Sequence, residues 1–232
     1  APTVYNVAFH VSYFWDGRSE SLEDLVLEGP LQNPNEMDTD WDEVLAKLGR
    51  DQALKRRFQR LFPEGLTPRT VSRAIAAFLR SLVALDGPFD RWLRGDEQAL
   101  SERQKRGYRL FKSYGCIACH QGVNVGGNMY ASMGVMGDYF ADRGGEITEA
   151  DLGRYNVTGR ESDRYVFKVP SLRMVVYTAP YFHDGSAQTL DEAVAVMARY
   201  QLGREIPAED RADIIAFFRS LAGRHPLLEA PQ

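Results

Sequence analysis

Both cysteines of the chain lie in one five-residue stretch, Cys116-Ile117-Ala118-Cys119-His120. In a helical turn, residues three apart share a face, and the residue that follows lies beside them. Two thiols in this arrangement can each form a thioether to a haem vinyl group, and the imidazole after them can point at the iron. The spacing therefore predicts one covalent haem c, attached at Cys116 and Cys119, with His120 as an iron ligand.

Two other interpretations of this motif fit the rest of the sequence less well. A C-x-x-C pair can form a redox disulfide, but that motif occurs beside a βαβ pattern, and the surrounding residues have helical spacing. A zinc site would need a second Cys or His pair at a suitable distance, which the chain lacks. Because bacteria attach haem c outside the cytoplasm, we expect a periplasmic location.

Composition excludes several other classes of protein. The chain has 232 residues, of which 44% are hydrophobic and 26% charged, and its formal net charge is −4. Such a mild charge does not indicate nucleic-acid binding. No stretch approaches the ~18 apolar residues of a membrane span. The chain begins at Ala1 without a methionine, so we expect a processed form or a fragment.

Helix-capping residues divide most of the chain into helices, and few strand signals are present. The clearest start is Thr67-Pro68, which is followed by apolar residues at helical spacing. The expected fold class is mainly α: a c-type cytochrome whose helices and long loops wrap around a covalent haem. The glycine-rich region 121–165 is long for a loop, and a haem would supply its missing core. The predicted helices begin near Ser19 or Ser21, and near Asp40, Asp51, Thr67, Phe89, Ser101, Thr189 and Pro207.

The second axial ligand of the iron is left open by spacing alone. A Met thioether is the usual choice in electron-transfer cytochromes, and it raises the reduction potential. Met129, Met133 and Met136 lie in the loop after the motif, whereas Met197 lies in a capped helix further on. Any of them can also be a residue that only fills core space.

Several further stretches carry a shared pattern. They are Ala1 to Asn6, Phe14 to Arg18, Glu36-Met37, Gly115 to His120, Gly122 to Asn124, Phe167 to Arg173, Thr178 to Gly185, and Ala193 to Met197. Together they resemble the bacterial di-haem cytochrome c peroxidases over essentially the whole chain. The resemblance implies a high-potential His/Met haem that receives electrons, with Met197 as its methionine ligand.

The chain departs from that family in one respect. The family has a second C-x-x-C-H motif upstream, at the low-potential haem where peroxide is reduced, and this sequence has one motif only. Either an N-terminal segment is missing, which we favour, or the chain is a natural single-haem relative. We expect residues 1–95 to be the remainder of the peroxidatic domain and residues 96–232 to be the electron-accepting cytochrome domain.

The resemblance also implies roles for residues outside the haem motif. Trp15 matches a tryptophan that helps electrons pass between the two haems, although most such residues are core aromatics. Glu36 matches a carboxylate that moves a proton onto the leaving oxygen of peroxide, although by itself it has the character of a solvated loop residue. The backbone carbonyls of Thr178 and Pro180 match calcium ligands, with an Asn ligand that would precede Ala1.

Arg173 and two histidines complete the candidates. The Arg173 guanidinium is a candidate partner for a haem propionate, since it can bind a carboxylate through two parallel hydrogen bonds. The alternative is a surface ion pair that contributes little. His10 and His225 have no special sequence context, and we interpret both as surface residues.

The function implied by the resemblance is reduction of hydrogen peroxide to water, with electrons from a small cytochrome c or a cupredoxin. This chain alone is expected to have little peroxidase activity. Three alternatives remain: a single-haem electron carrier, a non-catalytic haem-binding or sensor module, and a maturation enzyme of the methylamine-utilisation type. The last has a tyrosine in place of the axial methionine, and Met197 argues against it. The oligomeric state is left open, with a homodimer as one option.

Overall fold

The computed structural model describes residues 2–34 and 36–229. Ala1, where the family pattern begins, lies outside these residues. The regular structure is nearly all helical, and the predicted mainly α fold class is confirmed. A small antiparallel sheet pairs β1 (Tyr130–Ser132) with β2 (Val166–Lys168), in a register that places Tyr130 opposite Lys168.

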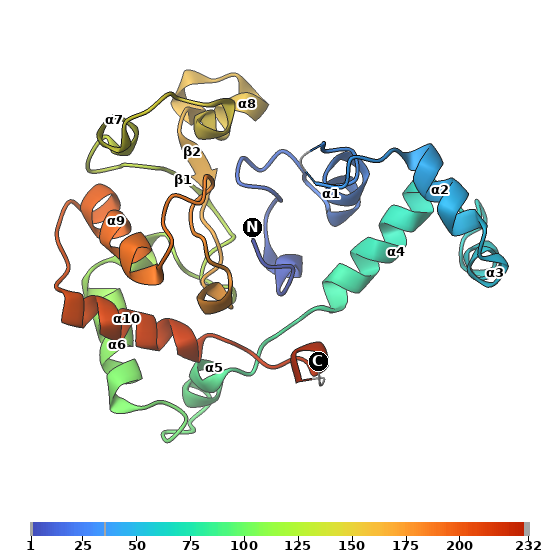
Figure 1. Ribbon diagram of the computed structural model, residues 1–232. Coiled ribbons are helices and arrows are strands. Elements are labelled where there is room, and N and C mark those ends of the chain that lie inside the picture. Colours follow the sequence, from blue (N-terminus) through green and yellow to red (C-terminus); the bar gives the residue numbers. More distant parts are fainter. Residues whose placement is uncertain (1, 35, 230–232) are drawn as a thin grey trace.

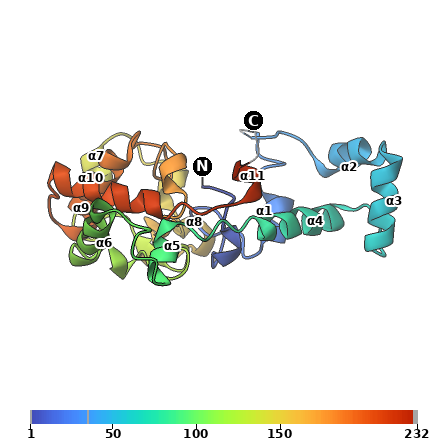
Figure 2. The same ribbon diagram turned by 90° about the horizontal axis from the view of Figure 1, so that it is seen from below.

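The N-terminal unit is built on helices that begin at the predicted capping residues. The side chains of Ser21, Asp40, Asp51 and Thr67 each accept a hydrogen bond from a backbone N–H in the first helical turn. This satisfies donors that have no partner within the helix. A small core joins the N-terminal segment to two helices. The elements are η1 (Val7–Phe9), α1 (Leu22–Glu28), α2 (Trp41–Gly49), α3 (Gln52–Leu61) and α4 (Pro68–Ser81). Figure 2 shows α2 and α3 at the far end of an elongated molecule.

The C-terminal unit contains the haem motif and the larger core. Helices α6 and α10 pack side by side, and α9 lies beside α10 (Figure 1). The region 121–165 is folded into short helical turns around β1, so it is not a structureless loop. The helical elements are α5 (Pro88–Leu93), α6 (Glu102–Ser113), η2 (Cys116–Ala118), α7 (Tyr139–Arg143), η3 (Glu149–Leu152), α8 (Tyr155–Thr158), η4 (Glu161–Asp163), η5 (Val175–Tyr177), α9 (Leu190–Leu202), α10 (Ala208–Ser220) and α11 (Pro226–Glu229).

The packing of α5 bears on the expected domain division. Phe89 of α5 lies 5.1 Å from Phe217 and 4.9 Å from Tyr108, measured between ring centroids, within the C-terminal core. Leu100 belongs to the same cluster. These contacts favour a boundary near Gly87, before α5, because this helix is buried with the C-terminal unit. The division at residue 95 stays a sequence-based prediction.

Asn6 links the N-terminal segment to both units. Its side chain is fully buried, donates to the carbonyl of Ala84 and accepts from the backbone N–H of Ala84. Its own N–H donates to Leu82, and its carbonyl accepts from Asn124 in the loop after the haem motif. Its φ of 63° lies in the left-handed region, which Asn tolerates better than most residues. The segment around Asn6 therefore lies between the two units (Figure 1).

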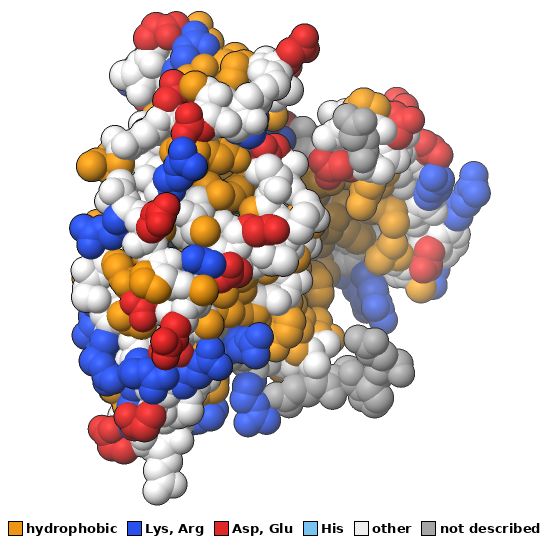
Figure 3. Space-filling view, turned by 60° about the vertical axis from the view of Figure 1, so that its left-hand side comes forward, with side chains coloured by type: hydrophobic (Ala, Val, Ile, Leu, Met, Phe, Trp, Pro, Cys, Tyr) orange, Lys and Arg blue, Asp and Glu red, His pale blue; other side chains and the backbone are white. Residues whose placement is uncertain are grey.

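Part of the apolar stripe of α4 is exposed. Val71 and Leu82 are buried, but Ile75 is 38% exposed and Phe78 is 54% exposed. The space-filling view shows apolar side chains gathered along the boundary between the two units (Figure 3). Large exposed apolar side chains that cluster on one face commonly mark a binding surface. The described part of the chain contains no helix with the length and apolar character needed to cross a membrane.

The close contact of α6 with α10 depends on Gly107. A Cβ atom added to Gly107 would lie 1.9 Å from the carbonyl oxygen of Asp213, far inside contact distance. Arg103 and Arg106 of α6 both donate to the carboxylate of Asp213, at 2.7 and 3.0 Å. The missing side chain lets the two backbones approach, and the two ion pairs hold the helices at that separation.

Gly107→Val should lower the free energy of unfolding, measured by denaturant titration, by about 1–3 kcal/mol or more, because the added side chain must push α10 away. Gly49→Ala is a control at a helical glycine without close neighbours. Gly49 is the last residue of α2, whereas Gly107 lies inside α6, and nothing lies within 4 Å of the added Cβ of Gly49. We expect no loss there, since Ala is favoured over Gly in a helix. Equal losses at both positions would contradict the role of close helix contact.

Candidate haem site

The haem motif lies on a tight helical turn that follows α6. Gly115, at a φ of 96°, follows the last residues of α6 and directly precedes η2. The N–H groups of Cys119 and His120 both donate to the carbonyl of Cys116. Neither cysteine forms a disulfide, and both are half-buried. The motif is therefore folded as the sequence predicts, with two free thiols and one imidazole held by the same turn.

The His120 ring is held in one tautomer by its surroundings. Its Nδ1 lies 3.3 Å from the carbonyl oxygen of Val125, and its pKa is lowered to about 4 by burial. A neutral imidazole that donates from Nδ1 keeps the lone pair of Nε2 free, which is the form that coordinates a metal. Gly126 permits this packing, since an added Cβ would lie 2.1 Å from the carbonyl oxygen of Pro170.

The surroundings of the first cysteine are apolar. Burial raises the pKa of the Cys116 thiol to about 11. Cys116 packs against the main core, together with Val125, Leu172 and Val194. A haem is a large apolar group, so a thiol at the edge of such a cluster and a neutral imidazole beside it fit covalent haem binding.

The methionine side chains differ in their burial and in whether another group already binds the sulfur. Met197 is half-buried on α9, and its neighbour Ala198 belongs to the same core cluster as Cys116. In contrast, the sulfur of Met133 accepts a hydrogen bond from Gln201, and Met136 is exposed. These surroundings favour Met197 as the second axial ligand, which stays a prediction.

Arg173 is buried in an ion pair that the sequence does not indicate. Its guanidinium binds both carboxylate oxygens of Asp90, at 2.6 and 2.9 Å, and donates to the carbonyls of Val123 and Leu221. These bonds use four of the five N–H groups of a guanidinium. The predicted propionate contact therefore has little support from this geometry, and the pair is no surface pair either, since Arg173 is 4% exposed.

Trp15 and Glu36 lie in different environments. Trp15 is half-buried against an aromatic cluster that includes Phe140 and Phe167, and its carbonyl accepts from the N–H of Lys168. Trp15 thus connects the N-terminal segment to the C-terminal unit. Glu36 is exposed and accepts a hydrogen bond from Asn33 at 2.8 Å. The described residues around Glu36 form no enclosed catalytic site.

The two predicted calcium ligands are close together. Thr178 and Pro180 flank Ala179, and the bond between Ala179 and Pro180 is cis. The Thr178 hydroxyl donates to the carbonyl of Val175. Within residues 2–34 and 36–229, neither the Thr178 nor the Pro180 carbonyl accepts a hydrogen bond. Both oxygens remain available for calcium binding, which stays a prediction.

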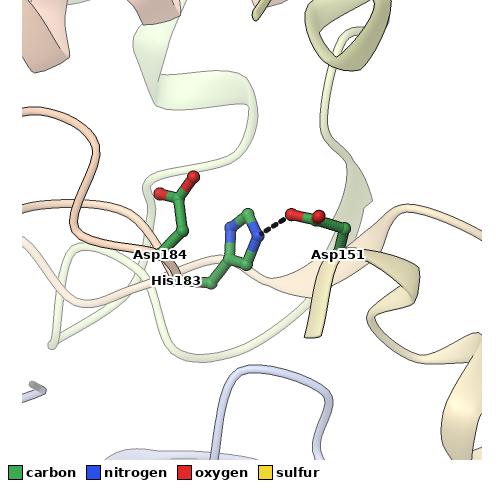
Figure 4. Close-up of side chains that lie close together, drawn as sticks. All are labelled: Asp151, His183 and Asp184. Atoms are coloured by element: carbon green, nitrogen blue, oxygen red, sulfur yellow. Dashed lines mark hydrogen bonds and ion pairs between the residues drawn. The ribbon is translucent and has the colours of Figure 1, made fainter. Parts of the chain in front are cut away.

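A second group of ionisable residues was not predicted from the sequence. His183 Nε2 lies 2.7 Å from a carboxylate oxygen of Asp151, and Asp184 lies on the other side of the ring (Figure 4). Such a trio can bind a metal ion, but here Arg143 bridges Asp151 and Asp184, at 2.7 and 3.0 Å. The Arg143 guanidinium holds the pKa of Asp151 well below its usual range. We interpret this group as an ion-pair network that fixes the loop at His183, on which the Phe167 ring stacks.

The prediction that His10 is a surface residue is wrong. The ring is largely buried, its Nδ1 lies 3.3 Å from the ammonium of Lys168, and burial lowers its pKa to about 4. Its partner is 158 positions away in the sequence, so no local pattern could have indicated the contact. His225 is half-buried and packs edge-on against Tyr5.

Comparison with known proteins identifies the family. Residues 1–98 match the family model described as di-haem cytochrome c peroxidase. The chain is 50% identical over 224 residues to the cytochrome c peroxidase Ccp of Escherichia coli strain K12, covering 96% of this chain and 47% of that protein. It is 40% identical over 232 residues to the cytochrome c551 peroxidase of Nitrosomonas europaea, covering all of this chain and 67% of that protein.

A solved structure with the same fold is a MauG-like protein associated with microbial copper homeostasis. Its TM-score is 0.78 at 26% identity, over 96% of this chain and 75% of that one. The chain thus spans about half to two thirds of the length of the curated relatives named above. The family predicted from the motifs is confirmed, and family membership implies haem c as the cofactor. The chain belongs to the di-haem cytochrome c peroxidase family.

Proposed function

We propose that this chain is the electron-transfer part of a periplasmic cytochrome c peroxidase that reduces hydrogen peroxide to water. The observation that carries the proposal is the His120 ring, which is neutral and donates from Nδ1 to Val125 beside two free half-buried thiols. A haem held there supplies one-electron redox chemistry. The electron donor is a small cytochrome c or a cupredoxin.

The chain's own residues have separate tasks in this proposal. Cys116 and Cys119 would hold the haem covalently, and His120 and Met197 would be the protein ligands of its iron. With both residues bound, the haem would accept and pass electrons without binding peroxide. The surrounding apolar cluster excludes water from the haem, which with a thioether ligand favours a high reduction potential.

The N-terminal unit, residues 1–95 in the sequence-based division, is proposed to belong to the peroxidatic domain. Two observations support this. Ile75 and Phe78 leave an apolar face of α4 exposed, as expected where a further apolar group or segment packs. Trp15 lies at the contact between the units, where an aromatic ring can help electron passage. Glu36 would deliver a proton to peroxide, and Thr178 and Pro180 would bind calcium.

A second candidate function is electron transfer without any peroxidase activity. The single C-x-x-C-H motif favours it, since this motif can attach only one haem. In the first candidate function a further apolar group or segment packs on the exposed face of α4, whereas the second candidate function does not need one. A maturation activity of the methylamine-utilisation type is disfavoured, because that subgroup has tyrosine where this chain has Met197.

The test is steady-state peroxide reduction with a chemically reduced donor protein. Intact mass and acid-acetone extraction are used first to establish one covalent haem on this chain. We expect little or no turnover by this chain, and turnover by a longer form that carries a second haem motif. Rapid turnover by this chain would mean that Met197 leaves the iron or never binds it. A chain of haem-free mass after expression with a haem-attachment system would refute the haem assignment itself.

A further inference from the structure

Helix α3 carries positive charge that its own residues do not balance. No Asp or Glu lies within the helix, and its four cations, all exposed, are Lys55, Arg56, Arg57 and Arg60. The stretch from residue 51 to residue 73 has six cations and two carboxylates, a net charge of +4, although the whole chain carries −4. A locally positive surface therefore lies on a chain that is negative as a whole.

Neighbouring helices do not neutralise the cations of α3. The ion pairs on those helices use other residues, since Lys47 of α2 binds Glu43 and Arg80 of α4 binds Glu23. Asp51, the carboxylate just before α3, is the N-cap of the helix and accepts hydrogen bonds from its backbone N–H groups. Within the described part of the chain, no carboxylate forms an ion pair with a cation of α3. These charges are therefore free to bind an external anion.

Three of the arginines lie on one face of α3. Residues three and four apart are neighbours on a helix surface, so Arg60 lies beside both Arg56 and Arg57. With Ala53 and Gln59 these arginines line an open hollow on the helix. A guanidinium can bind a phosphate through two parallel hydrogen bonds. The hollow therefore has the donors that a phosphate group needs.

An apolar side chain lies at the edge of the basic face. Leu61 is one turn after Arg57 and is 74% exposed, whereas Phe58 of the same helix is buried. A basic helix with exposed apolar residues beside its charges is typical of a membrane-surface helix. Figure 2 shows α3 running across the far end of the elongated molecule, with the C-terminal unit at the opposite end.

A flat anionic surface fits this face better than a folded protein partner does. Protein interfaces have an apolar centre within a polar rim, and lysine is depleted there. The face of α3 has the reverse arrangement, with arginines at its centre and Leu61 at its edge. Clusters of Lys and Arg on an amphipathic helix instead bind anionic phospholipids.

We propose that α3 is a docking surface for an anionic phospholipid bilayer, on which Arg56, Arg57 and Arg60 bind lipid phosphates and Leu61 enters the headgroup region. Each cation near such a surface strengthens binding by roughly fivefold. The attachment is reversible and weakens as salt rises, because added ions screen these charges. In this orientation the C-terminal unit points away from the bilayer and stays open to a soluble electron donor.

The experiment measures how much of the haem-loaded chain sediments with sucrose-filled vesicles. The vesicles contain phosphatidylcholine alone or an equal mixture with phosphatidylglycerol, and we expect binding to the mixed vesicles only. The combined changes Arg56→Gln, Arg57→Gln and Arg60→Gln should weaken this binding by on the order of a hundredfold. The combined changes Arg56→Lys, Arg57→Lys and Arg60→Lys keep the charge and should retain most of the binding.

Three arginines of the C-terminal unit supply the matched control. Arg109, Arg204 and Arg219 are also exposed, and none of them forms an ion pair with another described residue. Replacing all three with glutamine changes the net charge by the same amount and should leave binding to the mixed vesicles nearly unchanged. Leu61→Ser should weaken binding while leaving its salt dependence as it is, because the charges are kept.

Three results would overturn the docking of α3 on a bilayer. Equal losses in the two glutamine variants would mean that net charge alone decides binding. No binding of the unmutated chain to the mixed vesicles at low salt would exclude the bilayer as the occupant. If tripolyphosphate then raised the unfolding temperature of the chain, but not of the Arg56, Arg57 and Arg60 glutamine variant, the hollow would be a site for a free phosphate compound.

Discussion

Replacing Met197 with histidine is expected to lower the reduction potential of the haem at Cys116–His120 by more than about 0.1 V, a modest part of the roughly 0.8 V that axial ligands span. The reason is ligand chemistry, because a soft thioether stabilises the reduced iron more than a second imidazole does. Met197→Ala should leave one axial position open, so that carbon monoxide or cyanide binds. Redox titration and ligand-binding spectra measure the two effects.

The other methionines supply the controls for this result. Met136 is exposed and Met133 already accepts a hydrogen bond from Gln201, so Met136→Leu and Met133→Leu should leave the potential and the ligand spectra unchanged. If either of these changes opens the iron to carbon monoxide while Met197→Ala does not, then the axial ligand comes from the loop after the motif, the alternative that spacing alone leaves open.

Arg173→Met should destabilise the fold by about 3–5 kcal/mol, because it leaves the Asp90 carboxylate without its partner in a largely buried position. The same change removes donors from the carbonyls of Val123 and Leu221. Asp90 lies in the first turn of α5, while Val123 follows the haem motif, so this pair connects the entry of the C-terminal unit to the haem loop. Denaturant unfolding of the haem-loaded chain measures the loss.

Arg80 provides a matched comparison for Arg173. Its guanidinium also binds a carboxylate through two hydrogen bonds, to Glu23 at 2.7 Å each, but its side chain is 47% exposed. Exposed pairs contribute about 0–1 kcal/mol, so Arg80→Met should cost little. Similar losses at both arginines would mean that burial does not decide the contribution of the Arg173 pair.

The pH dependence of the Arg173 pair has a definite sign. Burial alone would raise the pKa of Asp90, but the hydrogen bonds and charge of Arg173 more than offset it, and the pKa is lowered. A carboxyl whose pKa is lower in the folded state stabilises the fold above its ordinary pKa of about 3.9. The stabilisation is lost as pH falls through the lower folded value. The difference in stability between the native chain and Arg173→Met should therefore shrink in acid.

Local sequence patterns were sufficient for the features that depend on neighbouring residues. A capping side chain bonds an N–H two or three positions away, so Ser21, Asp40 and Thr67 mark where helices begin, and the structure has these starts. The haem motif is equally local, since its thiols and imidazole occupy one turn. The family pattern extended the predictions to Met197 as an iron ligand and to Trp15 in electron passage, and both roles remain predictions.

Tertiary structure alone decided which residues meet across long sequence separations. Asp90 and Arg173 are 83 positions apart, and His10 and Lys168 are 158 apart. Neither pair belongs to a periodic pattern, so a sequence reading makes Arg173 a candidate for haem and His10 a surface residue. The physical reason is that burial and pairing of charge depend on the packing of whole units. The sequence predicts one covalent haem site and a helical fold around it, whereas the packing of residues 2–15 against β2 decides that His10 and Lys168 meet in the interior.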